Sequence, residues 1–223
     1  MYLKVKDITL YYQKKGKGPA LIMLHGNGED HRIFDKSVKI LKRYFTVYTI
    51  DTRGHGRSSK VKDYHYKDMA EDVYEFIRRL KLEKPILYGF SDGGIVGLLL
   101  ASKYPDLLSK LVISGANTKP SGMKRKWLWL FRLTYLFRPT PECKLMLTEP
   151  HITERMLQSI QILVYMTVGS KDMISVKDTK YIYKNIPNCR IKVFRGEDHG
   201  SYIIHSEKIG KFLEHVFVRK EYK

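Results

Sequence analysis

The chain has 223 residues, a length that suits one globular domain with a sizeable core and is short for two. Its hydrophobic fraction of 43% and aromatic fraction of 12% are those of a folded protein and exclude a largely disordered one. The net charge of +18 would suit an anionic partner, but the basic residues are spread along the chain without a nucleic-acid-binding motif. We therefore expect a lysine-rich solvated surface and no nucleic-acid partner.

Other features bear on the cellular compartment. No apolar run reaches the roughly 20 residues that a membrane-spanning helix needs, and the first residues lack the basic, apolar and small segments of a signal peptide. The two cysteines, Cys143 and Cys189, fit neither a zinc site nor a disulfide framework. We expect a cytoplasmic protein with reduced thiols and no bound metal.

The pattern of apolar residues switches between strand-like and helix-like along most of the chain. In chain order, strands are predicted at residues 3–5, 8–12, 20–24, 45–50, 85–88, 111–114, 162–168 and 190–194. Helices are predicted at residues 31–43, 66–80, 95–104, 176–185 and 205–218. The strands after residue 20 are apolar on both faces, which predicts a mostly parallel, twisted sheet with helices on both faces. The sequence thus predicts a single α/β domain over residues 1–223.

One segment, at about residues 117–160, interrupts this alternation. It holds an apolar, aromatic stretch over 127–137, which three basic residues precede and three prolines follow. We expect a short helical lid over the carboxyl edge of the sheet, where open α/β sheets bind their ligands. Trp127 and Leu130 are predicted to contact the substrate. The alternative is an interfacial helix that contacts a membrane, because tryptophan and basic residues flank the apolar stretch.

Residues 89–93 read Gly89-Phe90-Ser91-Asp92-Gly93, which matches the pattern G-x-S-x-G. A predicted strand precedes the pattern and a predicted helix follows it, as in a nucleophile elbow, where a sharp turn forces the serine into a strained backbone conformation. The residues two before and two after the serine must then be small, and both are glycine. The alternative is a glycine-rich loop with a surface serine, which the flanking elements disfavour.

The order of the motifs resembles the α/β-hydrolase superfamily over essentially the whole chain. The matching segments are His25-Gly26-Asn27-Gly28, the stretch 51–58, the elbow, Asp172 after a late strand and His199 after the last strand. The resemblance implies a catalytic triad in the order Ser, Asp, His. Ser91 would be the nucleophile, His199 the base that activates it, and Asp172 the carboxylate that orients the histidine. Asp178 and Asp198 are rival acids, but the first is predicted on a helix and the second is adjacent to the base.

The resemblance also implies an oxyanion hole formed by the backbone N–H groups of Asn27 and Asp92. The stretch 51–58 is predicted to be structural, with Asp51 and Arg53 tying loops together. The Asp92 side chain has two interpretations. The stretch around it resembles that of α-amino-acid ester hydrolases, in which a carboxylate receives a substrate ammonium. The alternative, which we favour, is that an aspartate at this place stabilises the N-terminus of its helix.

The combined pattern predicts a cofactor-independent serine hydrolase that acts as a carboxylesterase on small carboxylic esters, through an acyl-enzyme on Ser91. The same triad could instead cleave thioesters, amides or carbon–carbon bonds, because fold and triad do not set the leaving group. A non-catalytic binding member of the fold is the remaining alternative. The expected partner is a small-molecule ester, and the sequence sets neither the oligomeric state nor the natural substrate.

Overall fold

The computed structural model describes residues 1–219, so the last four residues of the predicted domain lie outside it. Eight strands form one sheet in the order β1-β2-β4-β3-β5-β6-β7-β8. Their bounds are β1 Tyr2–Val5, β2 Ile8–Lys15, β3 Ala20–Leu24, β4 Thr46–Asp51, β5 Ile86–Phe90, β6 Lys110–Ser114, β7 Leu163–Gly169 and β8 Cys189–Phe194. The pairs β1–β2 and β2–β4 are antiparallel, and all other neighbours are parallel. The predicted mostly parallel α/β sheet is confirmed.

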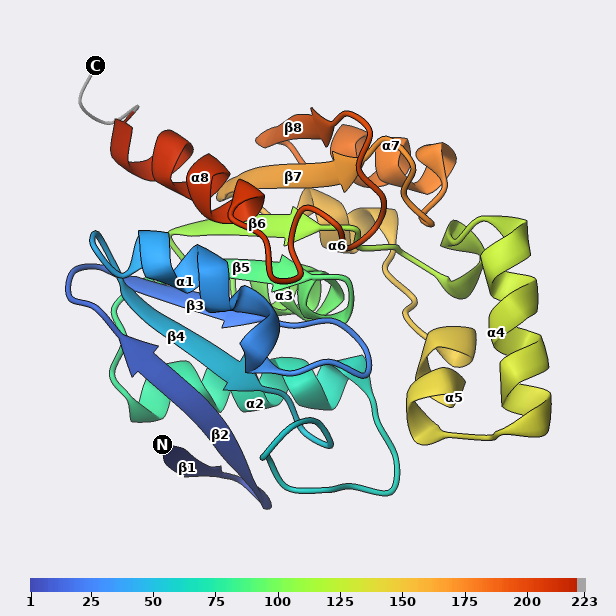
Figure 1. Cartoon of the computed structure of the whole chain (residues 1–223), viewed down its shortest axis with the longest axis horizontal. Helices are drawn as coiled ribbons and strands as arrows, with labels where there is room; N and C mark the ends of the chain where they lie inside the picture. Colours follow the sequence, from blue (N-terminus) through green and yellow to red (C-terminus); the bar gives the residue numbers. More distant parts are fainter. Residues whose placement is uncertain (220–223) are drawn as a thin grey trace.

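Helices cover both faces of this sheet because alternate residues of each strand point to opposite sides. In β3, Leu21 and Met23 belong to one buried apolar cluster, whereas Ile22 and Leu24 belong to the other. The first cluster includes residues of α1 (Asp35–Leu41) and α8 (Lys208–Glu214). The second includes residues of α2 (Tyr66–Arg79), α3 (Asp92–Lys103) and α7 (Val176–Asn185). Figure 1 shows α1 and α8 in front of the sheet and α2 and α3 behind it.

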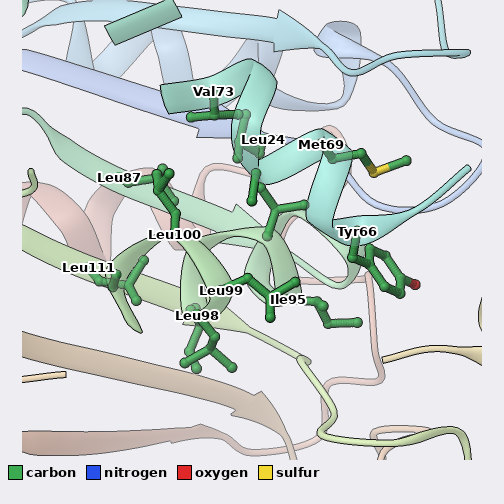
Figure 2. Packing of buried hydrophobic residues seen from close by; sticks show 14 of the residues in the cluster. Leu24, Tyr66, Met69, Val73, Leu87, Ile95, Leu98, Leu99, Leu100 and Leu111 are labelled. Carbon is green, nitrogen blue, oxygen red and sulfur yellow. The ribbon is translucent and has the colours of Figure 1, made fainter. Parts of the chain in front are cut away.

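Helix α3 is the most deeply buried helix of this arrangement, with ten of its twelve residues buried. Figure 2 shows its leucines in one apolar cluster with Tyr66 and Met69 of α2 and with Leu24, Leu87 and Leu111 of strands β3, β5 and β6. A helix that is apolar on all sides suits this central position between another helix and a sheet. The first residue of α3 is consequently held in place by the core of the protein.

The turn from β5 into α3 is possible only because the chain has glycine at two places. A Cβ atom on Gly89 would lie 2.1 Å from the carbonyl oxygen of Gly93, and one on Gly93 would lie 2.4 Å from that of Leu24. Ser91, between them, has φ 51° and ψ −112°, outside the conformations that a serine normally prefers. The predicted strained elbow is therefore present.

The segment between β6 and β7 carries three α-helices. They are α4 (Arg125–Phe137), α5 (Pro141–Thr148) and α6 (Glu154–Gln158). Helices α4 and α5 pack against each other and stand beside the carboxyl ends of the parallel strands, as Figure 1 shows. Helix α6 instead packs on α3 and α7, so the covering part of the predicted segment is α4 and α5 alone. No helix within residues 1–219 is long and apolar enough to cross a membrane.

The close approach of backbone at the elbow predicts that one added methyl group lowers the stability of the protein strongly. Gly93→Ala places its Cβ against backbone and should lower the free energy of unfolding by about 3 kcal/mol, as measured by urea denaturation. Gly97→Ala is the matched control in the same helix, because its Cβ would approach only the ends of side chains, those of Leu111 at 2.8 Å and Leu87 at 3.0 Å. Both variants gain the helix propensity of alanine, about 1 kcal/mol. Equal stability of the two variants would contradict the backbone clash.

Candidate active site

Three side chains from the ends of β5, β7 and β8 meet at the carboxyl edge of the sheet. The Nε2 atom of His199 lies 3.0 Å from Ser91 Oγ, and its Nδ1 atom lies 2.7 Å from Asp172 Oδ1. Because Nδ1 donates its proton to the carboxylate, Nε2 keeps its lone pair and can accept the proton of the Ser91 hydroxyl. The structure thus brings the three predicted triad residues together in the hydrogen-bonded order that nucleophilic catalysis needs. Their catalytic roles stay predictions.

The acid and the base are fixed in position by their surroundings. Asp172 is 2% exposed, and its Oδ1 atom also accepts the backbone N–H of Ile174 at 2.9 Å. Below the imidazole ring, Gly115 has φ +62°, and a Cβ atom there would lie 2.6 Å from His199 Cε1. The end of β6 therefore provides space for the histidine ring. It does not supply the acid of the predicted triad.

Both rival acids have structural contacts of their own. Asp178 accepts hydrogen bonds from the backbone N–H and the hydroxyl of Thr118, at 2.7 and 2.6 Å. Asp198 accepts the backbone N–H groups of Gly200 and Ser201, each at 2.9 Å, and so closes the turn that carries His199. Neither of these aspartates makes the hydrogen bond to the imidazole that Asp172 makes.

The two residues predicted to form the oxyanion hole lie in the loop after β3 and at the start of α3. Asn27 follows Gly26 in this loop, and the N–H of Asp92 heads α3, where no carbonyl of the helix can accept it. His25 anchors the loop, since its Nδ1 lies 2.7 Å from the Gly26 carbonyl oxygen and its Nε2 accepts the Thr52 N–H at 3.0 Å. Burial lowers the pKa of His25 to about 4, so it is a neutral structural residue.

The comparison with protein families agrees with this geometry. The model of the alpha/beta hydrolase fold matches residues 19–141, which is more than half of the chain and includes the loop after β3 and the elbow. The chain belongs to the α/β-hydrolase family. The resemblance found in the order of its motifs is thereby confirmed.

Three proteins with similar sequences have names that differ in the activity they state. The chain is 39% identical to the human serine hydrolase BPHL over 121 residues, which are 51% of this chain and 41% of that protein. It is 32% identical to a pimeloyl-[acyl-carrier protein] methyl ester esterase of Vibrio atlanticus over 54% of this chain and 45% of the relative. It is 33% identical to a fluoroacetate dehalogenase of Burkholderia sp. over 49% and 38%. The matched stretch thus spans less than half of each relative.

A solved structure resembles the chain over its whole length. A carboxylesterase of the thaumarchaeon Nitrososphaera gargenis superposes with a TM-score of 0.84 at 19% identity, covering 100% of this chain and 99% of that one. At this identity the likeness establishes the fold alone.

A cavity of about 190 Å³ opens beside Ser91. Its apolar lining includes Phe131 of α4, Met146 of α5 and Met173 of the loop after β7, and Ser91 and His199 also line it. The predicted lid therefore does line the cavity, but through residues that sequence reasoning missed. Single apolar residues in an apolar segment carried no signal to distinguish them.

The predicted contact of Trp127 and Leu130 with substrate is corrected by this arrangement. Neither residue lines the cavity beside Ser91; both line a separate open hollow on α4 together with Lys126 and Trp129. Leu130 is 43% exposed. For Leu130 the reason is helical geometry, because Phe131 takes the side of α4 that faces the cavity and Leu130 is rotated from it by about 100°.

Glu29 is a second residue that sequence reasoning missed. Its side chain lines the cavity with Ser91 and His199, and its Oε2 atom accepts the backbone N–H of Gly26 at 2.9 Å. Burial raises the pKa of this carboxyl to about 7, against the lowering effect of the Gly26 hydrogen bond. The only signal in the sequence was an acidic residue shortly after the His-Gly pair.

The Asp92 side chain is directed into the body of the protein rather than into the cavity lining. Its Oδ1 atom accepts the Tyr66 hydroxyl at 2.7 Å, and its Oδ2 atom accepts the Asn27 side-chain amide at 2.9 Å. Burial raises the pKa of this carboxyl. The same Asn27 amide also donates to the backbone oxygen of Glu142 in α5, at 3.3 Å. Asp92 thus holds the loop after β3 in place and, through Asn27, also the lid. Both of its oxygens already accept hydrogen bonds from other residues of the protein.

The stretch 51–58 ties loops together through the residues that were predicted to do so. Asp51 accepts the backbone N–H and the Nδ1–H of His31 at 2.8 and 2.7 Å, and the backbone N–H of Arg57 at 2.8 Å. Arg53 forms a two-point ion pair with the buried Asp72 of α2, at 2.6 and 2.7 Å.

One cluster has ligand types that could suit a metal. Asp30, His31 and Asp51 place their ligand atoms within 4.8 Å of one another, the one such group within residues 1–219. His31 bonds to Asp51, and Asp30 bonds to the guanidinium of Arg32. These hydrogen bonds explain why the three side chains lie close together. The absence of a bound metal stays a prediction.

The close approach of Gly115 to the His199 imidazole predicts that a side chain at position 115 lowers activity by more than any loss of stability explains. Gly115→Ala should displace His199 and lower kcat for an activated ester about 100-fold, with little change in KM. Gly196→Ala is the matched control, because Gly196 also has a positive φ of +82° but meets nothing within 4 Å. Equal kcat values for the two variants would contradict the proposed role of the space below the ring.

The raised pKa of Glu29 predicts a pH dependence of stability. Between its unfolded pKa of about 4.5 and its folded pKa of about 7, the folded protein binds this proton and the unfolded chain does not. Stability therefore falls as the pH rises through this window, by at most about 3 kcal/mol from this group. Glu29→Gln should flatten the fall, as measured by urea denaturation at pH 5 and pH 8.

The control for this experiment is Glu207→Gln. Its exposed carboxylate has a pKa lowered by a hydrogen bond from Lys211, so its removal should not flatten the fall. A wild-type pH profile that Glu29→Gln leaves unchanged would show that the carboxyl ionises normally in the folded protein.

Proposed function

We propose that the protein is a cofactor-independent carboxylesterase that cleaves small carboxylic esters through an acyl-enzyme on Ser91. The observation that carries the proposal is the continuous hydrogen-bond chain from Ser91 through His199 to the buried Asp172. A serine hydroxyl needs such a base to attack a carbonyl carbon at neutral pH. The name of the relative from Vibrio atlanticus, a methyl ester esterase, supports an ester as the substrate class.

In the first half of the reaction, Ser91 Oγ attacks the ester carbonyl carbon while His199 Nε2 takes the hydroxyl proton. The negative charge then develops on the former carbonyl oxygen, and the N–H groups of Asn27 and Asp92 stabilise it. Asp172 stabilises the imidazolium and holds its ring in place. Collapse of the tetrahedral intermediate breaks the ester C–O bond, and His199 gives its proton to the leaving alcohol.

In the second half, His199 takes a proton from water, whose oxygen attacks the acyl carbon. The second tetrahedral intermediate expels Ser91 Oγ, which regains its proton from His199, and the free acid leaves. Every proton in this cycle moves through one imidazole, which is why its position between Ser91 and Asp172 matters.

The size and lining of the cavity support small acyl groups. Its volume of about 190 Å³ is below the 300–1,000 Å³ typical of pockets for drug-sized ligands. Phe131, Met146 and Met173 offer an apolar surface to the acyl chain. Methionine side chains are unbranched and adapt to irregular shapes, so the cavity suits a range of short chains.

The same triad could also act on other acyl substrates. A carboxyl group in the cavity would distinguish aminoacyl esters from simple esters. An enzyme specific for aminoacyl esters needs a carboxylate near the substrate ammonium. From the sequence alone, Asp92 is one candidate for this carboxylate. In the structure both oxygens of Asp92 have internal donors, whereas Glu29 lines the cavity. If aminoacyl esters are preferred, Glu29→Gln should remove that preference more strongly than it affects a simple acyl ester.

The proposal predicts hydrolysis of p-nitrophenyl esters with an optimum at short acyl chains. We expect the rate to fall from butanoyl to decanoyl, and Ser91→Ala to lose at least about 10⁴-fold in kcat. Labelling of Ser91 by a serine-reactive phosphonate, read by intact mass, provides an independent measurement. Labelling without turnover of any ester would favour a thioester, amide or carbon–carbon substrate. Neither labelling nor turnover would favour the non-catalytic alternative.

A further inference from the structure

Helix α4 has an apolar outer face that nothing in residues 1–219 covers. None of its thirteen residues is buried. Trp129, Leu136 and Phe137 are 64%, 74% and 79% exposed, and Leu130 is 43% exposed. At 3.6 residues per turn, Trp129, Leu133 and Leu136 follow one line along the helix, and Leu130 and Phe137 lie beside it. Figure 1 shows that α4 stands at the edge of the molecule, away from the sheet.

Basic residues surround this face and acidic residues are missing from it. Residues 119–141 contain six lysines and arginines and no aspartate or glutamate. Arg125 and Arg132 lie along one flank of the apolar line, Lys126 lies on the other, and Lys124 and Arg138 adjoin the ends of the helix. Within residues 1–219, none of these five cations forms an ion pair with an acidic side chain.

The apolar face is the outer side of the wall of the candidate active site. Phe131 points from the opposite side of α4 into the cavity beside Ser91. A surface that contacted Trp129 and Leu136 would therefore lie one helix thickness, about 10 Å, from the cavity. An apolar substrate at that surface would be close to the entrance.

We propose that the outer face of α4 binds the surface of an anionic lipid bilayer. Tryptophan, leucine and phenylalanine would enter the boundary between headgroups and acyl chains, and the surrounding cations would contact the anionic headgroups. The helix lies along the bilayer and does not span it, because thirteen residues are too few. The proposal is independent of esterase activity, although it would give that activity access to substrates dissolved in the membrane.

The charge pattern favours a bilayer over a second copy of the chain. In a symmetric dimer through α4, the same patch would meet itself, and the cations of the two copies would be brought together without acidic partners. An anionic bilayer supplies negative charge over the whole face and accepts apolar side chains between its headgroups. The net charge of +18 acts in the same direction at longer range.

Intrinsic fluorescence tests this proposal directly, because the only two tryptophans of the chain, Trp127 and Trp129, are both in α4. Vesicles of phosphatidylcholine with 30% phosphatidylglycerol should shift the emission maximum of the full-length protein to shorter wavelength, and pure phosphatidylcholine vesicles should shift it far less. Sedimentation with the vesicles gives the partition coefficient. The catalytically inactive Ser91→Ala variant should bind equally well, which separates this result from the proposed hydrolysis.

Two variants and their controls identify the surface. Leu136→Ser with Phe137→Ser keeps both fluorophores and should lower the partition coefficient at least 10-fold. The control is Val176→Ser with Tyr183→Ser, which removes exposed apolar side chains from α7. Arg125→Gln, Lys126→Gln and Arg132→Gln together should lower partition into anionic vesicles about 100-fold. The control removes three exposed lysines, Lys36, Lys39 and Lys42, in and next to α1.

Four results would overturn the proposal. They are an absence of binding to anionic vesicles, equal binding to neutral vesicles, equal losses in the α4 variants and their controls, and a dimer in light scattering that the Leu136 and Phe137 substitutions abolish. The last result would assign the face to a second copy of the chain.

Discussion

The architecture of the site depends on the close approach of β5 and α3 at the elbow. The glycines at 89 and 93 let backbone contact backbone, and this contact holds Ser91 at a positive φ. A strained residue keeps its conformation only where its surroundings impose it, and here a helix buried on nearly all sides imposes it. The hydrophobic core thus fixes the direction of Ser91, the proposed nucleophile, and the loops after β7 and β8 have only to bring Asp172 and His199 to a point already determined.

A second set of contacts connects the residues of the proposed oxyanion hole to the lid. The Asn27 side chain donates both to Asp92 at the start of α3 and to the backbone of α5. The Glu142 carboxylate of α5 accepts the Tyr64 hydroxyl at 3.1 Å, which adds a tie to the loop before α2. A displacement of α5 would therefore move the residue whose N–H we assign to the oxyanion hole. The lid and the catalytic geometry are coupled through one amide side chain.

The sequence predicted the sheet, its helices and the meeting of Ser91, Asp172 and His199, because these depend on short-range patterns. Apolar periodicity identifies strands and helices, and the residues that follow parallel strands converge at one edge. The interior of the 117–160 segment could not be predicted in the same way. Which side of α4 faces the cavity depends on how α4 and α5 pack together, so Phe131 and Met146 could not be distinguished from Trp127 and Leu130. The position of Glu29 depends likewise on a loop conformation that no periodic pattern encodes.

The two carboxyl groups near the nucleophile show how proximity in sequence differs from proximity in the site. Asp92 is adjacent to Ser91 in the chain, yet it begins a helix whose first residue is turned into the core, where Tyr66 and Asn27 satisfy it. Glu29 is 62 positions away from Ser91 in the sequence, yet its side chain lines the same cavity. The pKa of Glu29, near 7, means that a modest change in its surroundings switches it between a neutral donor and an anion. An incoming ammonium would favour the anion, whereas the oxyanion of a simple ester intermediate would favour the neutral form. The charge that the substrate brings into the cavity therefore decides which protonation state of Glu29 accompanies the reaction.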